Sequence, residues 1–184
     1  IHLLLLLNKK KIINNFISKS YQDLVEKELL SAYFPWYYNS RSISVVDSEE
    51  DVNSGFTHKI YSKHKPVSSY HQLVFPILTE ALDKVNQECL SLIRIRAGMF
   101  TRNLNNNLPH APHIDYTFEH TTLLYYVNDS DGPTRFYKGD KIIKEVIPRK
   151  GTAVLFPFGS YHSSSDPIET PIRITLNYNF LCTK

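Results

Sequence analysis

The sequence predicts a mainly β fold with helices in its N-terminal part, in the α+β class. From Leu90 onward the hydrophobic pattern has a period of two, which is typical of strands whose side chains alternate between two faces. Tyr and Phe, which are frequent in strands, number 12 and 10. Turns rich in Gly, Pro, Asn and Asp separate the short predicted strands, and this arrangement favours a sandwich or a barrel.

Two helices are expected before the strands. Apolar residues at helical spacing predict one helix over residues 20–34, and Pro35 ends it. A second helix is expected over residues 69–89, where Pro76 would kink or interrupt the first turns. Between the helices, the polar stretch Tyr37–Lys65 predicts a long irregular loop or lid.

The strand-rich part begins with the alternating segment Ser91–Phe100. Lys138-Gly139-Asp140 predicts a hairpin turn between two later strands. After the first strand, the expected short strands are His113–Asp115, Thr121–Val127, Thr134–Tyr137, Ile142–Ile147, Thr152–Phe156 and Arg173–Phe180.

Length and charge limit the possible classes of protein. The 184 residues fit one domain, with helical support and a lid loop over 1–89 and a β core over 90–184. Lys and Arg number 21 against 18 Asp and Glu, a net charge of +3 without the basic stripe of a dedicated nucleic-acid binder. Two cysteines imply no disulfide framework and suit a reducing, cytoplasmic location.

The apolar run Leu3–Leu7 is too short to span a bilayer, and its neighbouring lysines follow it rather than precede it as in a signal peptide. We therefore expect no membrane partner, and we interpret the run as the start of a buried strand or helix.

Three residues suggest a metal site. His113 and Asp115 are two residues apart, so in a strand both side chains face the same way. His162 follows a later predicted strand and supplies a third ligand. Two histidines and one carboxylate form the facial triad of non-haem Fe(II) oxygenases, which leaves coordination positions open. Each residue alone has a structural alternative, because a single histidine or aspartate is more often a surface or capping group.

The spacing downstream resembles the 2-oxoglutarate- and Fe(II)-dependent dioxygenases, in particular their prolyl-4-hydroxylase-like branch. Arg173 lies eleven residues after His162, where that family places a basic residue for the far carboxylate of 2-oxoglutarate. A guanidinium suits this role because it binds a carboxylate bidentately and stays charged when buried. The strand Leu124–Asn128 resembles a family motif in which Tyr126 would bind the same carboxylate.

Two framework motifs agree with this resemblance, which covers roughly residues 90–180. Pro148, Gly151 and Phe156 match the spacing of a family motif, and Asp131–Phe136 matches another loosely, with Pro133 in place of an acidic residue. The resemblance implies a double-stranded β-helix, or jelly roll, with iron at the mouth of the barrel.

The resemblance also implies an activity. Fe(II), 2-oxoglutarate and O₂ would be the cofactor and cosubstrates, succinate and CO₂ the co-products, and hydroxylation of an unactivated C–H bond the reaction. His113, Asp115 and His162 would hold the metal, and no catalytic residue beyond the metal centre is expected. Because Asp115 is present, halogenation is not expected. The alternative is a non-oxygenase, cupin-like metal-binding protein, an isomerase or a sensor, which would not need Arg173 at the metal pocket.

Other residues have more than one interpretation. Asn177 is on the same strand face as Arg173 and is a further candidate for the 2-oxoglutarate carboxylate. Arg96 either lines the pocket or has a surface or structural role, and Trp36 either packs in the core or lines a substrate cleft. His110 and His120 are expected to be exposed or to lie beside the site. The sequence predicts a peptide or small-molecule substrate without identifying it.

Overall fold

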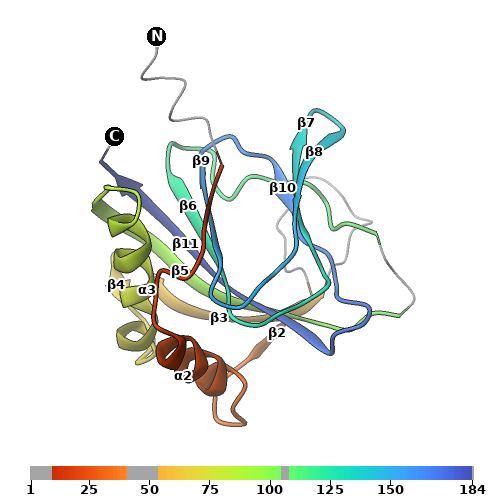
Figure 1. The fold of residues 1–184 in the computed structure, drawn as a ribbon, viewed down its shortest axis with the longest axis horizontal. Coiled ribbons are helices and arrows are strands. Elements are labelled where there is room, and N and C mark those ends of the chain that lie inside the picture. Colours follow the sequence, from red (N-terminus) through yellow and green to blue (C-terminus); the bar gives the residue numbers. More distant parts are fainter. Residues whose placement is uncertain (1–9, 41–53, 105–107, 184) are drawn as a thin grey trace.

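A computed structural model describes residues 10–40, 54–104 and 108–183, and its fold is a jelly roll built from two antiparallel sheets (Figure 1). The larger sheet has eight strands in the order β1-β9-β6-β11-β5-β3-β2, with β4 paired to β3. The smaller sheet has the order β10-β7-β8. The strands of the larger sheet are β1 (Lys11–Ile13), β2 (Tyr37–Asn39), β3 (Gly55–Ser62), β4 (Lys65–Pro66), β5 (Cys89–Thr101), β6 (Thr121–Tyr126), β9 (Ala153–Pro157) and β11 (Ile172–Cys182). Those of the smaller sheet are β7 (Thr134–Lys138), β8 (Lys141–Val146) and β10 (His162–Ser163).

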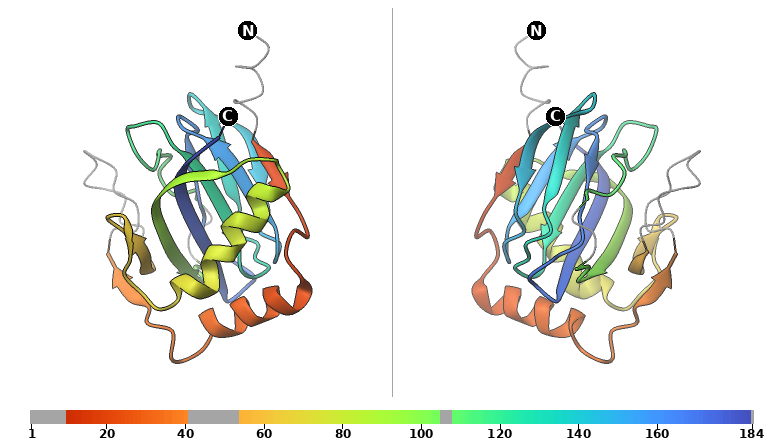
Figure 2. Two further views of the ribbon diagram at one scale, coloured as in Figure 1. Left: turned by 90° about the vertical axis from the view of Figure 1, so that its left-hand side faces the viewer. Right: turned by 90° about the vertical axis from the view of Figure 1, so that its right-hand side faces the viewer.

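Two helices, α2 (Lys19–Leu29) and α3 (His71–Asp83), cover the outer face of the larger sheet (Figures 1 and 2). The Ser18 hydroxyl caps α2 by accepting a hydrogen bond from the Tyr21 N–H at 3.2 Å. Both helices are shorter than the sequence predicts. The N–H of Leu30 closes the end of α2, and α3 continues through Pro76 before ending in a turn at Lys84. No helix in the described ranges has the length and apolar character needed to span a bilayer.

The expectation of an irregular loop over Tyr37–Lys65 is wrong for its described residues, which include β2 and β3. β3 pairs with β5 along most of its length, so its backbone completes the sheet even though its sequence is polar. The apolar–polar alternation of a strand cannot be seen in this sequence, because the buried residue His58 is polar, as are Thr57 and Lys59 on the opposite face. Residues 41–53 of the expected loop, and the run Leu3–Leu7, lie outside the described residues.

Apart from the short strand β10, which was not expected, and the segment His113–Asp115, the strands of the second half follow the sequence prediction closely. The Lys138–Asp140 turn joins β7 to β8, and Gly139 adopts a φ of 58°, which a residue without Cβ adopts readily. The segment His113–Asp115 is not a strand: it forms a single antiparallel bridge between His113 and His162.

The larger sheet separates the main apolar core from the interior of the jelly roll, which holds a smaller apolar cluster together with the polar side chains of the candidate site. Along β11, Ile174, Leu176, Tyr178 and Phe180 join the core beneath the helices. The alternate side chains Arg173, Thr175, Asn177 and Asn179 are also buried but face the inside of the jelly roll, where the candidate site lies. One strand therefore connects core packing to the site through its alternation alone.

Candidate metal centre and adjoining pocket

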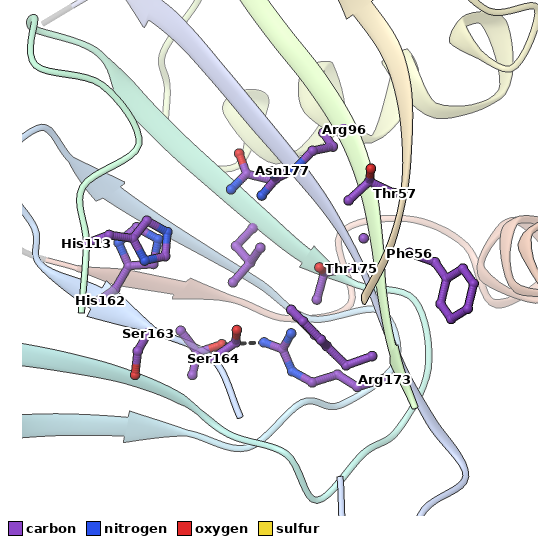
Figure 3. Close-up of a pocket in the computed structure, with 14 residues that line it drawn as sticks. Phe56, Thr57, Arg96, His113, His162, Ser163, Ser164, Arg173, Thr175 and Asn177 are labelled. Atoms are coloured by element: carbon purple, nitrogen blue, oxygen red, sulfur yellow. Dashed lines mark hydrogen bonds between the residues drawn. The ribbon is translucent and has the colours of Figure 1, made fainter. Parts of the chain in front are cut away.

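A single pocket inside the jelly roll brings together side chains from six strands and the segment before β6 (Figure 3). His113 and His162 lie together at one end, and Arg173 lies at the other. Arg96, Thr57 and Asn177 lie on a further side of it (Figure 3).

His113 and His162 are held opposite each other by their own backbones. Two hydrogen bonds, 2.9 Å from the His113 N–H and 3.0 Å from the His162 N–H, join the residues as an antiparallel bridge. Each Nδ1 lies beside a backbone carbonyl two residues earlier, that of Ala111 at 3.2 Å and that of Ser160 at 3.0 Å. Because a carbonyl only accepts, both Nδ1 atoms are the protonated ones, and both Nε2 atoms keep a lone pair.

Asp115 completes this group, and four donors orient its carboxylate. Arg94 donates to Oδ1 at 3.2 Å, and Asn179 donates to Oδ2 at 2.8 Å. Thr122 at 3.2 Å and Asn177 at 3.3 Å also donate to Oδ2. The Asp115 side chain is only 3% exposed, so these donors fix its position in a water-poor setting.

The protonation states of the three side chains fit a divalent metal. Burial, with a smaller effect of His162, lowers the pKa of His113 to about 4, and burial also lowers the pKa of His162. Burial opposes the ionisation of Asp115, but His162, Arg94 and the Asn179 hydrogen bond hold the pKa of this carboxyl well below its ordinary value. At neutral pH the group therefore offers two neutral imidazoles and a carboxylate, with candidate ligand atoms all within 4.8 Å of one another.

Arg173 is 2% exposed and is held by uncharged partners. Its Nε donates to the Gly132 carbonyl at 2.8 Å, and its Nη2 donates to Thr134 Oγ1 at 2.8 Å. The Tyr126 hydroxyl donates to the same Thr134 oxygen at 2.8 Å. Within the described ranges, no carboxylate lies within ion-pair distance of this guanidinium. A buried positive charge of this kind favours an anionic ligand.

The structure separates the three residues expected at the 2-oxoglutarate carboxylate. Arg173 and Tyr126 share a partner in Thr134, and their guanidinium and ring lie 5.9 Å apart. Asn177 lines the same pocket, but its amide donates toward Asp115 instead.

Several site residues were missed at the sequence level. Three of them donate hydrogen bonds to the Asp115 carboxylate: Arg94, Thr122 and Asn179. The fourth is Thr134, which accepts hydrogen bonds from both Arg173 and Tyr126. Strand alternation could have identified two of these residues. Arg94 shares a face of β5 with Arg96, and Asn179 shares a face of β11 with Arg173.

The remaining candidates have distinct places. His110 is 3% exposed, with its Nδ1 2.9 Å from Ser164 Oγ and its Nε2 2.9 Å from Asp166 Oδ1. Of its two expected roles, an exposed residue or a residue beside the site, the first is therefore wrong. His120 is also buried, at 5% exposure, beside Phe118 and Phe158. Trp36 packs against Phe34 at the edge of the core, in agreement with the core-packing interpretation.

Comparison with known proteins identifies the fold. No protein-family model matches the sequence, and no curated protein matches it. Among solved structures, a prolyl hydroxylase from Trichoplax adhaerens, in complex with a peptide fragment of the hypoxia inducible factor oxygen degradation domain, superposes with a TM-score of 0.70. It has 17% identity, and the match covers 96% of this chain and 85% of that one. A 2OG-Fe(II) oxygenase family protein from Burkholderia pseudomallei gives a TM-score of 0.69 at 10% identity over 94% and 84% of the two chains.

A third solved structure of the same fold has a different reaction. SnoN, a non-heme α-ketoglutarate-dependent epimerase from nogalamycin biosynthesis, superposes with a TM-score of 0.65 at 12% identity, covering 95% of this chain and 79% of that chain. At such identities the likeness establishes the fold, which is the jelly roll found in 2-oxoglutarate- and Fe(II)-dependent oxygenases.

Proposed function

We propose that this protein is an Fe(II)- and 2-oxoglutarate-dependent dioxygenase that hydroxylates an unactivated C–H bond. The observation that carries the proposal is that the His113 and His162 imidazoles and the buried Arg173 guanidinium line one pocket. The pocket thus offers a metal site at one end and a carboxylate site at the other. The likeness in fold to 2-oxoglutarate-dependent oxygenases supports this interpretation.

His113, Asp115 and His162 would hold the iron, two through Nε2 and one through its carboxylate. The metal with 2-oxoglutarate and O₂ would supply the oxidising power, through decarboxylation of 2-oxoglutarate to succinate and CO₂. The chain itself keeps both imidazoles neutral and Asp115 ionised, and it fixes the carboxylate with Arg94 and Asn179. No general base is required.

Arg173 would anchor the far carboxylate of 2-oxoglutarate. Its Nε hydrogen and one Nη2 hydrogen are bound within the chain, which leaves both Nη1 hydrogens and the second Nη2 hydrogen to donate to a ligand. Thr134 accepts from both Arg173 and Tyr126, so its own hydroxyl hydrogen is left to donate to the same carboxylate. Tyr126 thereby supports the anchor through Thr134. Asn177 is assigned to ordering Asp115, a change from the role that its position on the strand suggests.

The substrate is proposed to be a peptide or a small molecule. One structural neighbour is a prolyl hydroxylase in complex with a peptide, and another is an epimerase. Stereochemical inversion at a C–H bond is therefore the second candidate reaction, on the same metal and cosubstrate. The cupin-like alternative is less favoured because it gives no reason for Arg173 to line the pocket that holds the histidines.

The test is to add Fe(II) and 2-oxoglutarate without oxygen and to record the visible charge-transfer band of the chelate. We expect the band in the wild type, its loss in His113→Ala because the metal is lost, and a right-shifted 2-oxoglutarate titration in Arg173→Ala with metal affinity retained. A wild-type chain that binds Fe(II) but gives no band, and forms no succinate with any substrate pool, would refute the oxygenase proposal.

A further inference from the structure

The wall of the pocket formed by β5 and β3 carries a row of positive charges. Arg94 and Arg96 are alternate residues of β5 and face the interior together. Lys59 of β3 is the direct cross-strand partner of Arg96, so its side chain is on the same face, where it is exposed. Like charges placed directly opposite each other destabilise a sheet. Asp115 offsets part of this repulsion through its ion pair with Arg94, and an anion bound at this wall would offset more of it.

Arg94 and Arg96 have different surroundings. Arg94 is paired with Asp115 at 3.2 Å, and that carboxylate is the proposed metal ligand. Arg96 lies two residues further along β5, opposite Asn177 of β11, and it lines the pocket next to the Asn177 amide (Figure 3). Burial and the nearby Arg94 lower the pKa of Arg96 to about 10, so it remains a cation at neutral pH.

The Arg96 position is separate from the Arg173 anchor. In the register of β5 and β11, Arg96 pairs with Asn177, whereas Arg173 pairs with Phe100. These two pairs are four residues apart, about 13 Å along the strands. Gly98 lies between them, and a Cβ added there would meet only Thr175 Oγ1, at 3.7 Å, which leaves the middle of this wall open. The two arginines therefore extend from separate parts of the pocket wall.

We propose that the substrate carries an oxyanion, a carboxylate or a phosphate, and that Arg96 and Lys59 bind it at the β5–β3 wall. This inference rests on the proposed function, because it reserves Arg173 for 2-oxoglutarate. A guanidinium and an ammonium on adjacent strands offer a forked donor and a mobile point charge to one oxyanion. Substrate selection would then depend on charge at this wall, beside the metal ligands.

Binding to the holoprotein tests the proposal without turnover. The protein is loaded with Zn(II) and 2-oxoglutarate, and ligand-detected NMR compares N-acetylglycine with its neutral amide, N-acetylglycinamide, and separately measures inorganic phosphate. We expect the carboxylate or the phosphate to bind the wild type at least about tenfold more tightly than the amide, because only an anion pairs with both cations. Which of the two anions binds identifies the source of the oxyanion.

Variants at the wall locate the site. Arg96→Gln is expected to weaken anion binding by about tenfold or more, and Lys59→Gln by a smaller factor of about threefold because Lys59 is exposed. Arg96→Lys retains the charge and is expected to restore part of the affinity. Lys138→Gln removes an exposed lysine at the end of β7 and serves as the matched control, with no change expected.

Two outcomes would overturn the inference. One is equal binding of the carboxylate, the phosphate and the amide to the wild type. The other is a loss of 2-oxoglutarate affinity in Arg96→Gln, measured by anaerobic titration of the Fe(II) chelate band, which would assign Arg96 to the cosubstrate. Failure of the proposed function has a different signature, since the wild type would then give no chelate band at all.

Discussion

The side-chain amide of Asn179 donates to Asp115 Oδ2 at 2.8 Å, and it also lies 2.9 Å from the Thr122 hydroxyl. Asn179 is fully buried and sits on the central strand β11, whereas Asp115 lies in a segment without regular strand structure. The rigid part of the fold therefore fixes the orientation of a carboxylate that its own backbone does not hold in a sheet.

This relationship predicts the effect of removing the amide. Asn179→Ala is expected to weaken metal binding by about 10–100-fold, because the partners of a metal-binding carboxylate control its orientation. Titration of the apoprotein with Fe(II) or Zn(II) measures the change, and chemical denaturation of the apoprotein separates it from a loss of folding. Unchanged affinity in a folded variant would show that Asn179 has a packing role only.

Thr134 is predicted to be important for stability as well as for 2-oxoglutarate. Thr134→Val removes the shared acceptor and leaves two buried donors, on Arg173 and Tyr126, without their partner. We expect the free energy of unfolding to fall by about 2 kcal/mol and the 2-oxoglutarate titration to shift to higher concentration.

A matched control is Thr152→Val. The Thr152 hydroxyl donates one hydrogen bond, to Asn14 Oδ1 at 3.0 Å, and Thr152 is not among the residues that line the pocket. Urea denaturation should give this variant a cost of about 1 kcal/mol with unaltered 2-oxoglutarate binding. If the two variants lost the same stability and bound 2-oxoglutarate equally, the shared-acceptor role of Thr134 would be wrong.

Two buried tyrosines in the core are predicted to respond in opposite directions. The Tyr125 hydroxyl has no hydrogen-bond partner among the described residues, whereas the Tyr178 hydroxyl donates to the Val74 carbonyl at 2.8 Å. Tyr125→Phe should therefore raise the free energy of unfolding by about 1 kcal/mol, and Tyr178→Phe should lower it by about 1 kcal/mol. Denaturant melts of both variants test this, and destabilisation by Tyr125→Phe would contradict it.

The loop that contains Asp131 is predicted to lose stability in acid. It adjoins Gly132, whose carbonyl accepts a hydrogen bond from Arg173. The Asp131 carboxylate accepts hydrogen bonds from the N–H groups of residues 168–170, at 2.9, 2.8 and 3.0 Å, and from the Thr170 hydroxyl at 2.6 Å. Burial opposes ionisation, but these donors lower the pKa of Asp131 well below its ordinary value of 3.8. A carboxyl with a lowered folded pKa stabilises the fold fully above its unfolded pKa and progressively less below it.

The corresponding variant is Asp131→Asn. At pH 7 it should be less stable than the wild type by about 2 kcal/mol, and this difference should narrow as the pH falls below about 4. Denaturation curves of both proteins at pH 7 and below about pH 4 measure this difference in the free energy of unfolding. A difference that stayed constant with pH would mean that ionisation of Asp131 does not contribute.

Much of the site could be predicted from spacing, and the rest depends on strand pairing. His113, Asp115, His162 and Arg173 stand in a recognisable order, and the structure brings all of them around one interior. The role of Asn177 could not be predicted, because sharing a face with Arg173 does not say which end of the pocket an amide contacts. That information comes from the position of Asp115, which no local pattern fixes.

The fold shows the same division. Strong alternation made β5 to β9 and β11 predictable, whereas β3 was missed because polar residues occupy its pocket-side face and His58 occupies its core face. A polar residue in a sequence carries no sign of whether it faces water or a buried functional interior. Lys59 was hidden for this reason, although it contributes to the proposed substrate wall.

The alternation of β11 also restricts how this protein can change its length. A single residue inserted directly after Arg173 would turn Ile174, Leu176 and Tyr178 toward the metal, and it would turn Thr175, Asn177 and Asn179 toward the core beneath the helices. Both the stability and the chemistry would be lost in one event. Variation among descendants of this chain should therefore accumulate in the connecting segments, or in β11 as substitutions that respect the polarity of each face.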